Sequence, residues 1–587
     1  MKKYFPLFWV FYLLCAFSAH AGEGRYTIPL TGGGWSLWLD KEASWQNDRL
    51  YLPHEITDLS LLPVNVPTGG WQTLSHNPDA VPVEVPGTVE EYLTVTDNPR
   101  PENFRGVSWW YRKITIPADQ QKKRFIIYFE SVRMRAEVYL DGKLVAYDLI
   151  GETPFHVDIT DEAKPGKEQL LAIRVTNPGG NFHWQDFDIM KWGEYNIPPS
   201  RSFTGIIGRV KLESVNPVFI SDIYMQNTPE LTKVNAILSF TNETSSSVKQ
   251  DVELIVNEKG NPDKVVFRQT LKAISFPAGN HEVTIPVNVP DAKLWDLSTP
   301  ELYTCNVLIK KGKKTLDQDK KDFGFRWFTV DGVGKDAVLR LNGRRIMLRS
   351  AISWGYFPVT GLIATTEMAE KQVRTAKSLG LNMLNFHRCI GSPVVLEKAD
   401  ELGLLYYEEP GSFHSANHDP FIRTIVNEKL KRMVYRDRSH PSLVIFNLIN
   451  EFGGPLSQDK ALVAKRMNDM REAHAIDPSR IMSFTSGWAG SEDKEEDSKA
   501  HMLPFDTTLY RKGWYDNHRA GGPETWVENY YKGPKDNIMY TSNRTEVYLR
   551  GEEGAISTPP RIQMIYDQIK STGKTGWDGL FWQSQYK

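Results

Sequence analysis

The spacing of apolar residues changes once along the chain, and this change separates two kinds of architecture. Up to about residue 330, short runs such as RFIIYFESV and AEVYLDGKLVAY alternate apolar with polar residues, and Gly, Asp and Pro separate the runs. A period of two predicts β-strands that bury one face. After Gly332, apolar strands alternate with segments of helical period, so we expect strands and helices in turn.

The β-rich part divides into two predicted domains. Residues 22–216 contain many short strands and a tight hairpin signal at Asp141-Gly142, which predicts a β-sandwich of jelly-roll type. Residues 217–330 contain the alternating strands VNAILSFTN, QDVELIVNE, HEVTIPVNV and LYTCNVLIKK. This pattern suits an immunoglobulin-like sandwich, and we expect that domain to act as a spacer.

Residues 331–587 predict a (β/α)8 barrel, also called a TIM barrel. The candidate strands are residues 345–350, 382–386, 404–407, 443–449 and 481–484, a weak strand near Leu503, and residues 546–549 and 580–582. The helices between them include residues 366–379, 393–402, 428–435 and 459–476. An open, doubly wound sheet is the alternative, but no glycine-rich phosphate loop follows any strand.

The eighth candidate strand lies very close to the last residue, Lys587. No residues remain for a helix that would close the barrel. We therefore expect either a fragment of a longer chain, which we favour, or a barrel that lacks its last helix.

The N-terminal stretch MKKYFPLFWVFYLLCAFSAHAGEG begins with two lysines, continues with an apolar core and ends in small residues at Ala19-His20-Ala21. This order predicts a secretory signal peptide over residues 1–21, and hence a periplasmic or extracellular protein. A membrane anchor is less favoured because the apolar run is short. The net charge of −2 gives no electrostatic reason to expect nucleic acid or a membrane surface as partner.

Composition narrows the function further. Aromatic residues make up 12% of the chain and include 17 Trp, and aromatic faces stack on sugar rings, although large cores also use Trp. One of the 3 Cys lies in the predicted signal peptide. Cys305 and Cys389 fall in different predicted domains, so we expect no disulfide.

The clearest chemical signal is the segment RDRSHPSLVIFNLINEFGG, from Arg436 to Gly454. Its apolar run reads as a buried parallel strand, and the polar pair Asn450-Glu451 follows directly at the strand's C-terminal end. Barrel enzymes keep their chemistry at that end. On these residues alone, a solvated Glu and a helix-capping Asn explain the pair equally well.

This segment resembles the acid/base segment of glycoside hydrolase family 2, which contains β-galactosidases, β-glucuronidases and β-mannosidases. Its Arg-Asp turn, His-Pro-Ser and terminal Asn-Glu match, and it departs at Ser439 and Ile449. The segments VSWWYRKITIP, FESVRMRAEVYLDGKLV and SFTGIIGRVKLESV resemble the family's sugar-binding domain. KLWDLSTPELYTCNVLI and FGFRWFTVDG resemble its linker into the catalytic domain.

The segment EVYLRGEEGA resembles the family's nucleophile segment, Ser-Glu-(Tyr or Phe)-Gly-Ala. Aligning Gly554-Ala555 places Glu552 at the nucleophile position and Glu553 at the usual aromatic position. Glu553 therefore stays an alternative nucleophile. If neither glutamate is catalytic, the segment is a solvated acidic loop.

The resemblance implies a retaining mechanism, in which two carboxyl groups lie about 5–5.5 Å apart. Glu451 would act as general acid and then as general base, and Glu552 would form the glycosyl-enzyme. Asn450 would hydrogen-bond the sugar 2-hydroxyl, a contact that strengthens in the transition state.

Other strand ends resemble the family's substrate contacts in part. The residues implied are His387, Arg388, Glu409, Tyr510 and Trp582, and ordinary packing at the barrel mouth is the alternative for each. We expect no cofactor, although the segment with Glu409 and His414 resembles one that binds magnesium in some β-galactosidases.

The long aromatic loop over residues 177–202 is predicted to reach the active site from the first domain. Trp184 offers a stacking face and Asp186 a hydrogen-bond acceptor, and Asp186 is preferred over Asp188. Such a wall would close the pocket and favour chain ends as substrates. The alternative is that the loop only joins the two domains.

Together these features predict a secreted, retaining exo-β-glycosidase, most like a β-galactosidase, that acts on an oligosaccharide or small glycoside. β-Glucuronidase or β-mannosidase specificity is the first alternative. Against it, Cys389-Ile390-Gly391 replaces the Trp-Gly-Gly of β-mannosidases, and no clear Asn-x-Lys motif of glucuronidases is present. A non-catalytic sugar-binding protein is the second alternative, and the intact Glu451 and Glu552 argue against it.

Overall fold

The structure is a computed structural model. It describes residues 24–93, 104–179, 189–198, 203–331, 338–355, 357, 361–413, 419–452, 458–486 and 502–504, the backbone of 514–519 and 547–553, and positions 563–564, 567 and 571. The predicted signal peptide and the predicted site residues Trp184, Asp186, His414, Tyr510 and Trp582 lie outside these residues. Within the described part, no helix combines the length and the apolar character needed to span a bilayer.

The first domain is a sandwich of two antiparallel sheets. One sheet has the order β1-β15-β6-β10, with β1 Tyr26–Pro29, β15 Val210–Val215, β6 Arg124–Phe129 and β10 Phe155–Asp158. The other has the order β3-β2-β5-β11-β8-β9, with β3 Val81–Val85, β2 Gly32–Asp40, β5 Gly106–Thr115, β11 Glu168–Asn177, β8 Arg135–Leu140 and β9 Lys143–Asp148.

Apolar residues alternate with polar ones along these strands, and the apolar side chains fill the space between the two sheets. Trp110, Ile127 and Ile173 are fully buried there. The predicted hairpin is confirmed, because β8 pairs with β9 across Asp141-Gly142, and both turn residues have positive φ. Smaller elements surround this sandwich: β4 Gly87–Thr88, α1 Val89–Tyr92, β7 Val132–Arg133, β12 Met190–Trp192, β13 Tyr195–Ile197 and β14 Gly205–Ile206. Short 3-10 turns complete the domain: η1 Pro53–Glu55, η2 Leu59–Leu61, η3 Trp71–Ser75 and η4 Ala118–Gln120.

The second domain is a smaller antiparallel sandwich. Its sheets have the orders β16-β17-β20 and β19-β18-β21-β22. The strands are β16 Val218–Asn227, β17 Lys233–Asn242, β18 Val248–Glu258, β19 Val265–Phe276, β20 Gly279–Asn288, β21 Tyr303–Lys311 and β22 Lys314–Phe323. The four strands expected from alternation are present, and β16, β19 and β22 were not predicted. Strand β22 was missed because its sequence, KTLDQDKKDF, is mostly polar and it buries few side chains.

A three-stranded sheet leads into the third domain: β23 Phe328–Asp331, β24 Val338–Leu341 and β25 Arg344–Ile346. Its apolar side chains pack on Met383, Leu405 and Val444, which lie where the parallel strands begin. The sheet therefore covers the N-terminal end of those strands. The prediction that residues 345–350 form the first barrel strand is wrong, because residues 344–346 belong to this cover.

The third domain contains five consecutive parallel strands: β26 Ser350–Ser353, β27 Met383–Phe386, β28 Leu405–Glu408, β29 Leu443–Asn450 and β30 Ile481–Ser486. The helices that follow these strands are α2 Thr366–Ser378, α3 Pro393–Leu402, α4 Pro420–Asp437 and α5 Lys460–Ile476. The predicted helix over residues 428–435 is therefore much longer. It starts earlier because Asp419 caps the backbone N–H of Phe421 and Pro420 occupies the first turn.

The strand predicted near Leu503 is present as β31, Met502–Leu503, but it runs antiparallel to β30. Further along the chain, β32 Trp514–Arg519 and β33 Val547–Glu553 form a parallel pair. The polar sequence WYDNHR of β32 gave no apolar signal, so this strand was not predicted.

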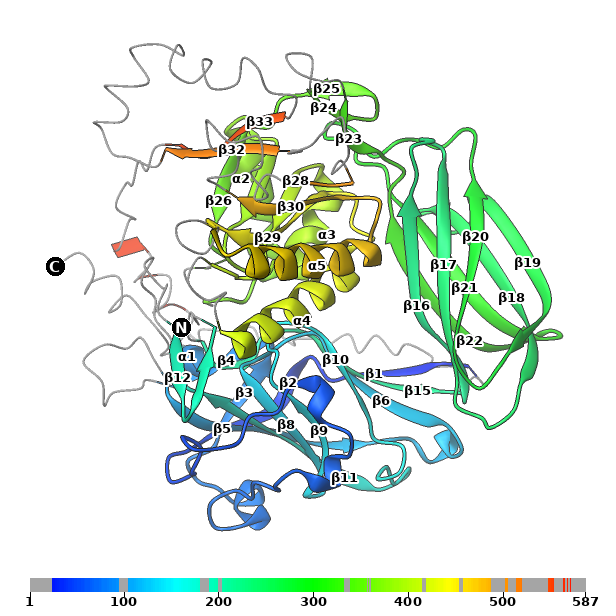
Figure 1. Cartoon of the computed structure of the whole chain (residues 1–587). Helices are drawn as coiled ribbons and strands as arrows, with labels where there is room; N and C mark the ends of the chain where they lie inside the picture. Colours follow the sequence, from blue (N-terminus) through cyan, green and yellow to red (C-terminus); the bar gives the residue numbers. More distant parts are fainter. Residues whose placement is uncertain are drawn as a thin grey trace, which may run out of the picture.

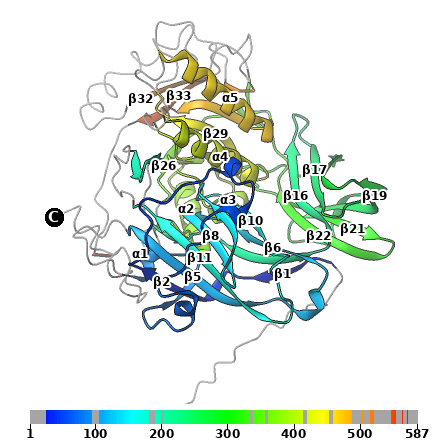
Figure 2. The same ribbon diagram turned by 60° about the horizontal axis from the view of Figure 1, so that its bottom comes forward.

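Figure 1 places the third domain, with its yellow helices, above the first domain and to the left of the second domain. Helix α4 lies along the first domain, and the view in Figure 2 agrees. The second domain contacts the turn before β29 through an ion pair between Arg438 and Asp222, with 2.5 Å between Nη2 and Oδ2. The strand that carries the Asn-Glu pair is thus approached from both neighbouring domains.

Candidate active site

The site is built on β29, whose eight residues are all buried between β28 and β30. The strand ends at Asn450 because Glu451 has a φ of +52°. This value lies in the left-handed region, which residues other than glycine rarely adopt. Such a conformation costs about 1–3 kcal/mol and persists only where its surroundings hold it. Two backbone bonds do so, from Glu451 N–H to the Ser486 carbonyl (2.8 Å) and from Asn450 N–H to the Ser412 carbonyl (3.0 Å).

The side chain of Asn450 is 1% exposed, and its Nδ2 donates to the hydroxyl oxygen of Ser486 at 2.9 Å. That hydroxyl in turn donates to Oε1 of Glu409, also at 2.9 Å. Hydrogen bonds thus join residues at the ends of three neighbouring strands. One of these residues, Ser486, also accepts the backbone N–H of the half-buried Glu451.

Glu409 lies at the end of β28 and is fully buried. Its Oε2 accepts the backbone N–H of Arg388 at 2.7 Å and lies 3.9 Å from Nδ1 of His387. Both oxygens of Glu409 thus face protein groups. The sequence implied a substrate contact for Glu409, and this geometry supports a positioning role.

His387 and Arg388 follow the end of β27, and Arg388 has a φ of +55°. The Arg388 guanidinium lies 3.8 Å from the ring centre of Phe413, which forms a parallel bridge with Asn450. The His387 ring meets Trp354 edge to face, with 4.7 Å between ring centres. The fold therefore brings His387, Arg388, Glu409, Asn450 and Glu451 together, as the sequence implied.

The second carboxylate belongs to β33, where the backbone reaches Glu552 and Glu553 at the C-terminal end. In the register with β32, Glu552 pairs with His518 and Glu553 pairs with Arg519. Both glutamates therefore end a parallel strand, as expected, and the choice of Glu552 over Glu553 stays a prediction.

The described end of the 177–202 loop contacts the barrel domain. Strands β12 and β13 form a hairpin, and Nδ2 of Asn196 donates to Oδ2 of Asp419, the cap of α4, at 2.6 Å. The ring of Tyr195 lies 4.9 Å from that of Phe421 in the first turn of α4. This hairpin therefore anchors the loop that carries Trp184 and Asp186.

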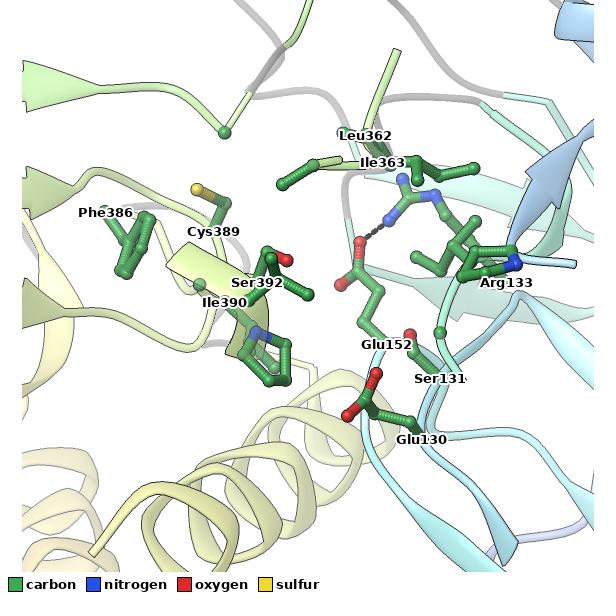
Figure 3. A pocket seen from close by; sticks show the side chains of 18 of the residues that line it. Glu130, Ser131, Arg133, Glu152, Leu362, Ile363, Phe386, Cys389, Ile390 and Ser392 are labelled. Carbon is green, nitrogen blue, oxygen red and sulfur yellow. Dashed lines mark ion pairs between the residues drawn. The ribbon is translucent and has the colours of Figure 1, made fainter. Parts of the chain in front are cut away.

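A cavity of about 100 Å³ lies between the first domain and the ends of β26, β27 and β28. Figure 3 shows that Ser131 and the ion pair of Arg133 with Glu152 face Cys389 and Ile390 across it. Its wall also includes Arg388, Phe413 and Lys429. Sequence reasoning missed this cavity, because its lining comes from turns of two domains that no motif connects.

The loop that follows β27 is supported by a second buried acid, Glu408. Its Oε1 accepts the backbone N–H of Gly391 at 2.7 Å. Burial and the nearby Asp437 raise the pKa of the Glu408 carboxyl well above its ordinary value. This carboxyl therefore acts as a structural hydrogen-bonding group for the loop after β27.

Metal binding was considered for Glu409 and His414. Among the residues that the structure describes, no three His, Cys, Asp or Glu side chains are grouped as a metal ion requires, and His414 lies outside them. The expectation of no cofactor therefore stays a prediction, with a divalent cation at this point as its alternative.

Comparison with protein families matches three domain models of one family to the chain. They are the sugar binding domain of glycosyl hydrolases family 2 over residues 33–196, the model named glycosyl hydrolases family 2 over 218–326, and the family's TIM barrel domain over 335–541. The chain belongs to glycoside hydrolase family 2. The predicted family is confirmed, and so is the predicted fold class of jelly-roll sandwich, immunoglobulin-like sandwich and TIM barrel.

Several proteins named as glycosidases are similar to this chain. A putative β-glucuronidase of Formosa agariphila is 25% identical over 84% of this chain and 56% of its own length. A β-galactosidase of Thermoanaerobacterium thermosulfurigenes is 30% identical over 62% of this chain and 49% of its own length. The chain therefore spans about half the length of the curated relatives it matches.

A solved family 2 structure from Bacteroides cellulosilyticus shares the fold. It has a TM-score of 0.67 at 19% identity, and the match covers 89% of this chain and 66% of that one.

Proposed function

We propose that this chain is a retaining β-glycosidase with Glu451 as its acid/base and Glu552 as its nucleophile. The observation that carries the proposal is the conformation of Glu451, a half-buried carboxyl held at φ +52° at the end of a buried parallel strand. A strained backbone that its neighbours fix is characteristic of functional sites. The end of a barrel strand is also where enzymes of this fold carry out their chemistry.

The two steps follow from the chemistry of glycosides. In the first step, Glu552 attacks the anomeric carbon while Glu451 gives its proton to the leaving oxygen, so that the glycosidic bond breaks and a glycosyl-enzyme forms. In the second step, Glu451 takes a proton from water, the water oxygen bonds to the anomeric carbon, and Glu552 leaves. Asn450 meets the 2-hydroxyl of the sugar in both transition states.

For the substrate we propose a terminal β-galactoside or β-glucuronide. The names of two relatives favour these sugars, because one is a β-galactosidase and another a putative β-glucuronidase. Action at chain ends rests on the 177–202 loop, whose hairpin is fixed against α4. Secretion rests on the N-terminal signal sequence alone.

The test is a screen of nitrophenyl glycosides on the purified protein, followed by NMR of the first product. We expect turnover of one β-glycoside and initial release of the β-anomer. Glu451→Gln should lower kcat strongly, whereas Glu367→Gln, which changes an exposed helix residue, should not. Turnover of none of the glycosides, or release of the α-anomer, would contradict the proposal.

A further inference from the structure

Ser486 is the last residue of β30 and contacts the ends of two neighbouring strands. Its carbonyl accepts the N–H of Glu451 at 2.8 Å, and its hydroxyl lies 2.9 Å from both Asn450 Nδ2 and Glu409 Oε1. The side chain is 4% exposed, so water does not replace these partners. No sequence motif of the family singled out this residue.

The direction of each bond follows from the chemistry of the groups. A carboxylate oxygen only accepts hydrogen bonds, so the single proton of the Ser486 hydroxyl goes to Glu409. The hydroxyl oxygen is then left as an acceptor toward Asn450. The Asn450 amide must therefore turn its NH2 group toward Ser486 and its oxygen away from it.

Glu409 is itself held in place. Its other oxygen accepts the Arg388 N–H at 2.7 Å, which ties the carboxylate to the end of β27. The orientation of Asn450 is therefore set by a chain of bonds that starts two strands away. Because Asn450 is 1% exposed, no solvent contact competes with this chain.

We propose that Ser486 is a positioning residue that fixes the orientation of the Asn450 amide for the sugar 2-hydroxyl. The role rests on the proposed glycosidase function, because only there does Asn450 meet a sugar. Loss of the hydroxyl would remove one of the donors to Glu409 and the acceptor of Asn450 Nδ2. The amide could then turn, while the backbone bond from Glu451 to the Ser486 carbonyl would remain.

The test uses the glycoside that the wild-type protein hydrolyses best and its 2-deoxy analogue. The two substrates differ only in the presence of the 2-hydroxyl. The quantity measured is the ratio of their kcat/KM values. Ser486→Ala should reduce this ratio at least tenfold, toward the ratio of Asn450→Ala. Ser486→Thr, which keeps a hydroxyl, should restore most of it.

Ser214→Ala is the control, because Ser214 is also a buried serine, and its hydroxyl donates to Oε1 of Gln120 at 3.0 Å within the first domain. It should leave the ratio unchanged. If Ser486→Ala slows both glycosides by the same factor, the residue is merely structural and the proposal fails.

A crystal structure of Ser486→Ala gives a second result that does not depend on turnover. The Asn450 amide should rotate or change partners, and an unchanged amide would overturn the positioning role. If the wild-type protein hydrolyses no glycoside while the amide still rotates in the variant, the glycosidase proposal fails and the control of Asn450 by Ser486 stands.

Discussion

Nζ of Lys429 donates a hydrogen bond to Oε2 of Glu152 at 2.7 Å, across the boundary between the barrel domain and the first domain. Lys429 lies on α4, and Glu152 also pairs with Arg133 of its own domain. One turn further along α4, Arg432 contacts Asp148 at 2.7 Å. Helix α4 leads into the turn before β29, so these contacts tie the first domain to the strand that carries Glu451.

Lys429→Ala should destabilise the protein by about 2 kcal/mol, because Glu152 keeps Arg133 but loses a nearly buried hydrogen-bond donor. Lys431→Ala is the matched control on the same helix, since the side chains of Lys431 and its partner Glu472 are 32% and 46% exposed. The control should cost less than about 1 kcal/mol. Thermal unfolding checks both variants, and equal midpoints for them would show that the boundary pair adds nothing.

The assignment of the nucleophile gives a second prediction. Glu552→Gln should abolish turnover, because an amide cannot form the glycosyl-enzyme, whereas Glu553→Gln should keep activity within about tenfold of the wild-type protein. Added azide should restore turnover of an activated substrate by Glu451→Ala, because azide attacks the glycosyl-enzyme without needing a base, and it should not do so in Glu552→Gln. A dead Glu553→Gln beside an active Glu552→Gln would exchange the two roles.

The fold could be predicted largely because its apolar pattern is strong. The core strand β29 and helix α3 have the bounds that their patterns gave, except that β29 includes Asn450. The errors lie where the pattern is weak. Strands β22 and β32 are polar. The predicted strand over residues 345–350 rested on the apolar run Ile346-Met347-Leu348, but residues 344–346 pair with β24 instead.

The candidate site could be predicted only where a motif is continuous in sequence. Asn450-Glu451 and Glu552 lie in such motifs. Ser486 does not, because its role depends on the lateral register that pairs it with Asn450 in the neighbouring strand. The burial of Glu409 was missed for the same reason, since a single segment does not show what covers a strand end.

A third prediction concerns the 177–202 loop, whose hairpin is fixed by Asn196 and Asp419. If the loop forms a wall of the pocket, Asp186→Ala and Trp184→Ala should raise KM on a small glycoside about tenfold or more without changing the melting temperature. Asn196→Ala is the comparison for a purely adhesive role and should mainly lower the melting temperature. Unchanged kinetics in both pocket variants, together with lower stability, would show that the loop only joins the domains.

The last prediction uses Glu90, which lies in α1 and is 2% exposed. Its Oε2 accepts the N–H of Thr204 at 2.9 Å, and no donor among the described residues reaches Oε1. Burial raises the pKa of this carboxyl to about 7, and the charge of Arg133 offsets only part of that effect.

The sign of the pH dependence follows from the proton balance. Between the ordinary pKa of 4.5 and about 7, the folded protein keeps the Glu90 proton while the unfolded chain loses it. The protonated Glu90 therefore makes its full contribution to the free energy of unfolding below pH 4.5. This contribution is lost as the pH rises to about 7. The loss should amount to at most about 3 kcal/mol.

Glu90→Gln keeps the shape and the acceptor for Thr204 but cannot ionise. Its melting temperature should therefore fall less than that of the wild-type protein between pH 5 and pH 8, and above pH 7 the variant should be the more stable of the two. Glu84→Gln, which changes an exposed carboxyl on β3, controls for the loss of one negative charge and should follow the wild-type profile. Parallel profiles for the wild-type protein and Glu90→Gln would show that Glu90 is already ionised at pH 5 and that its burial carries no such cost.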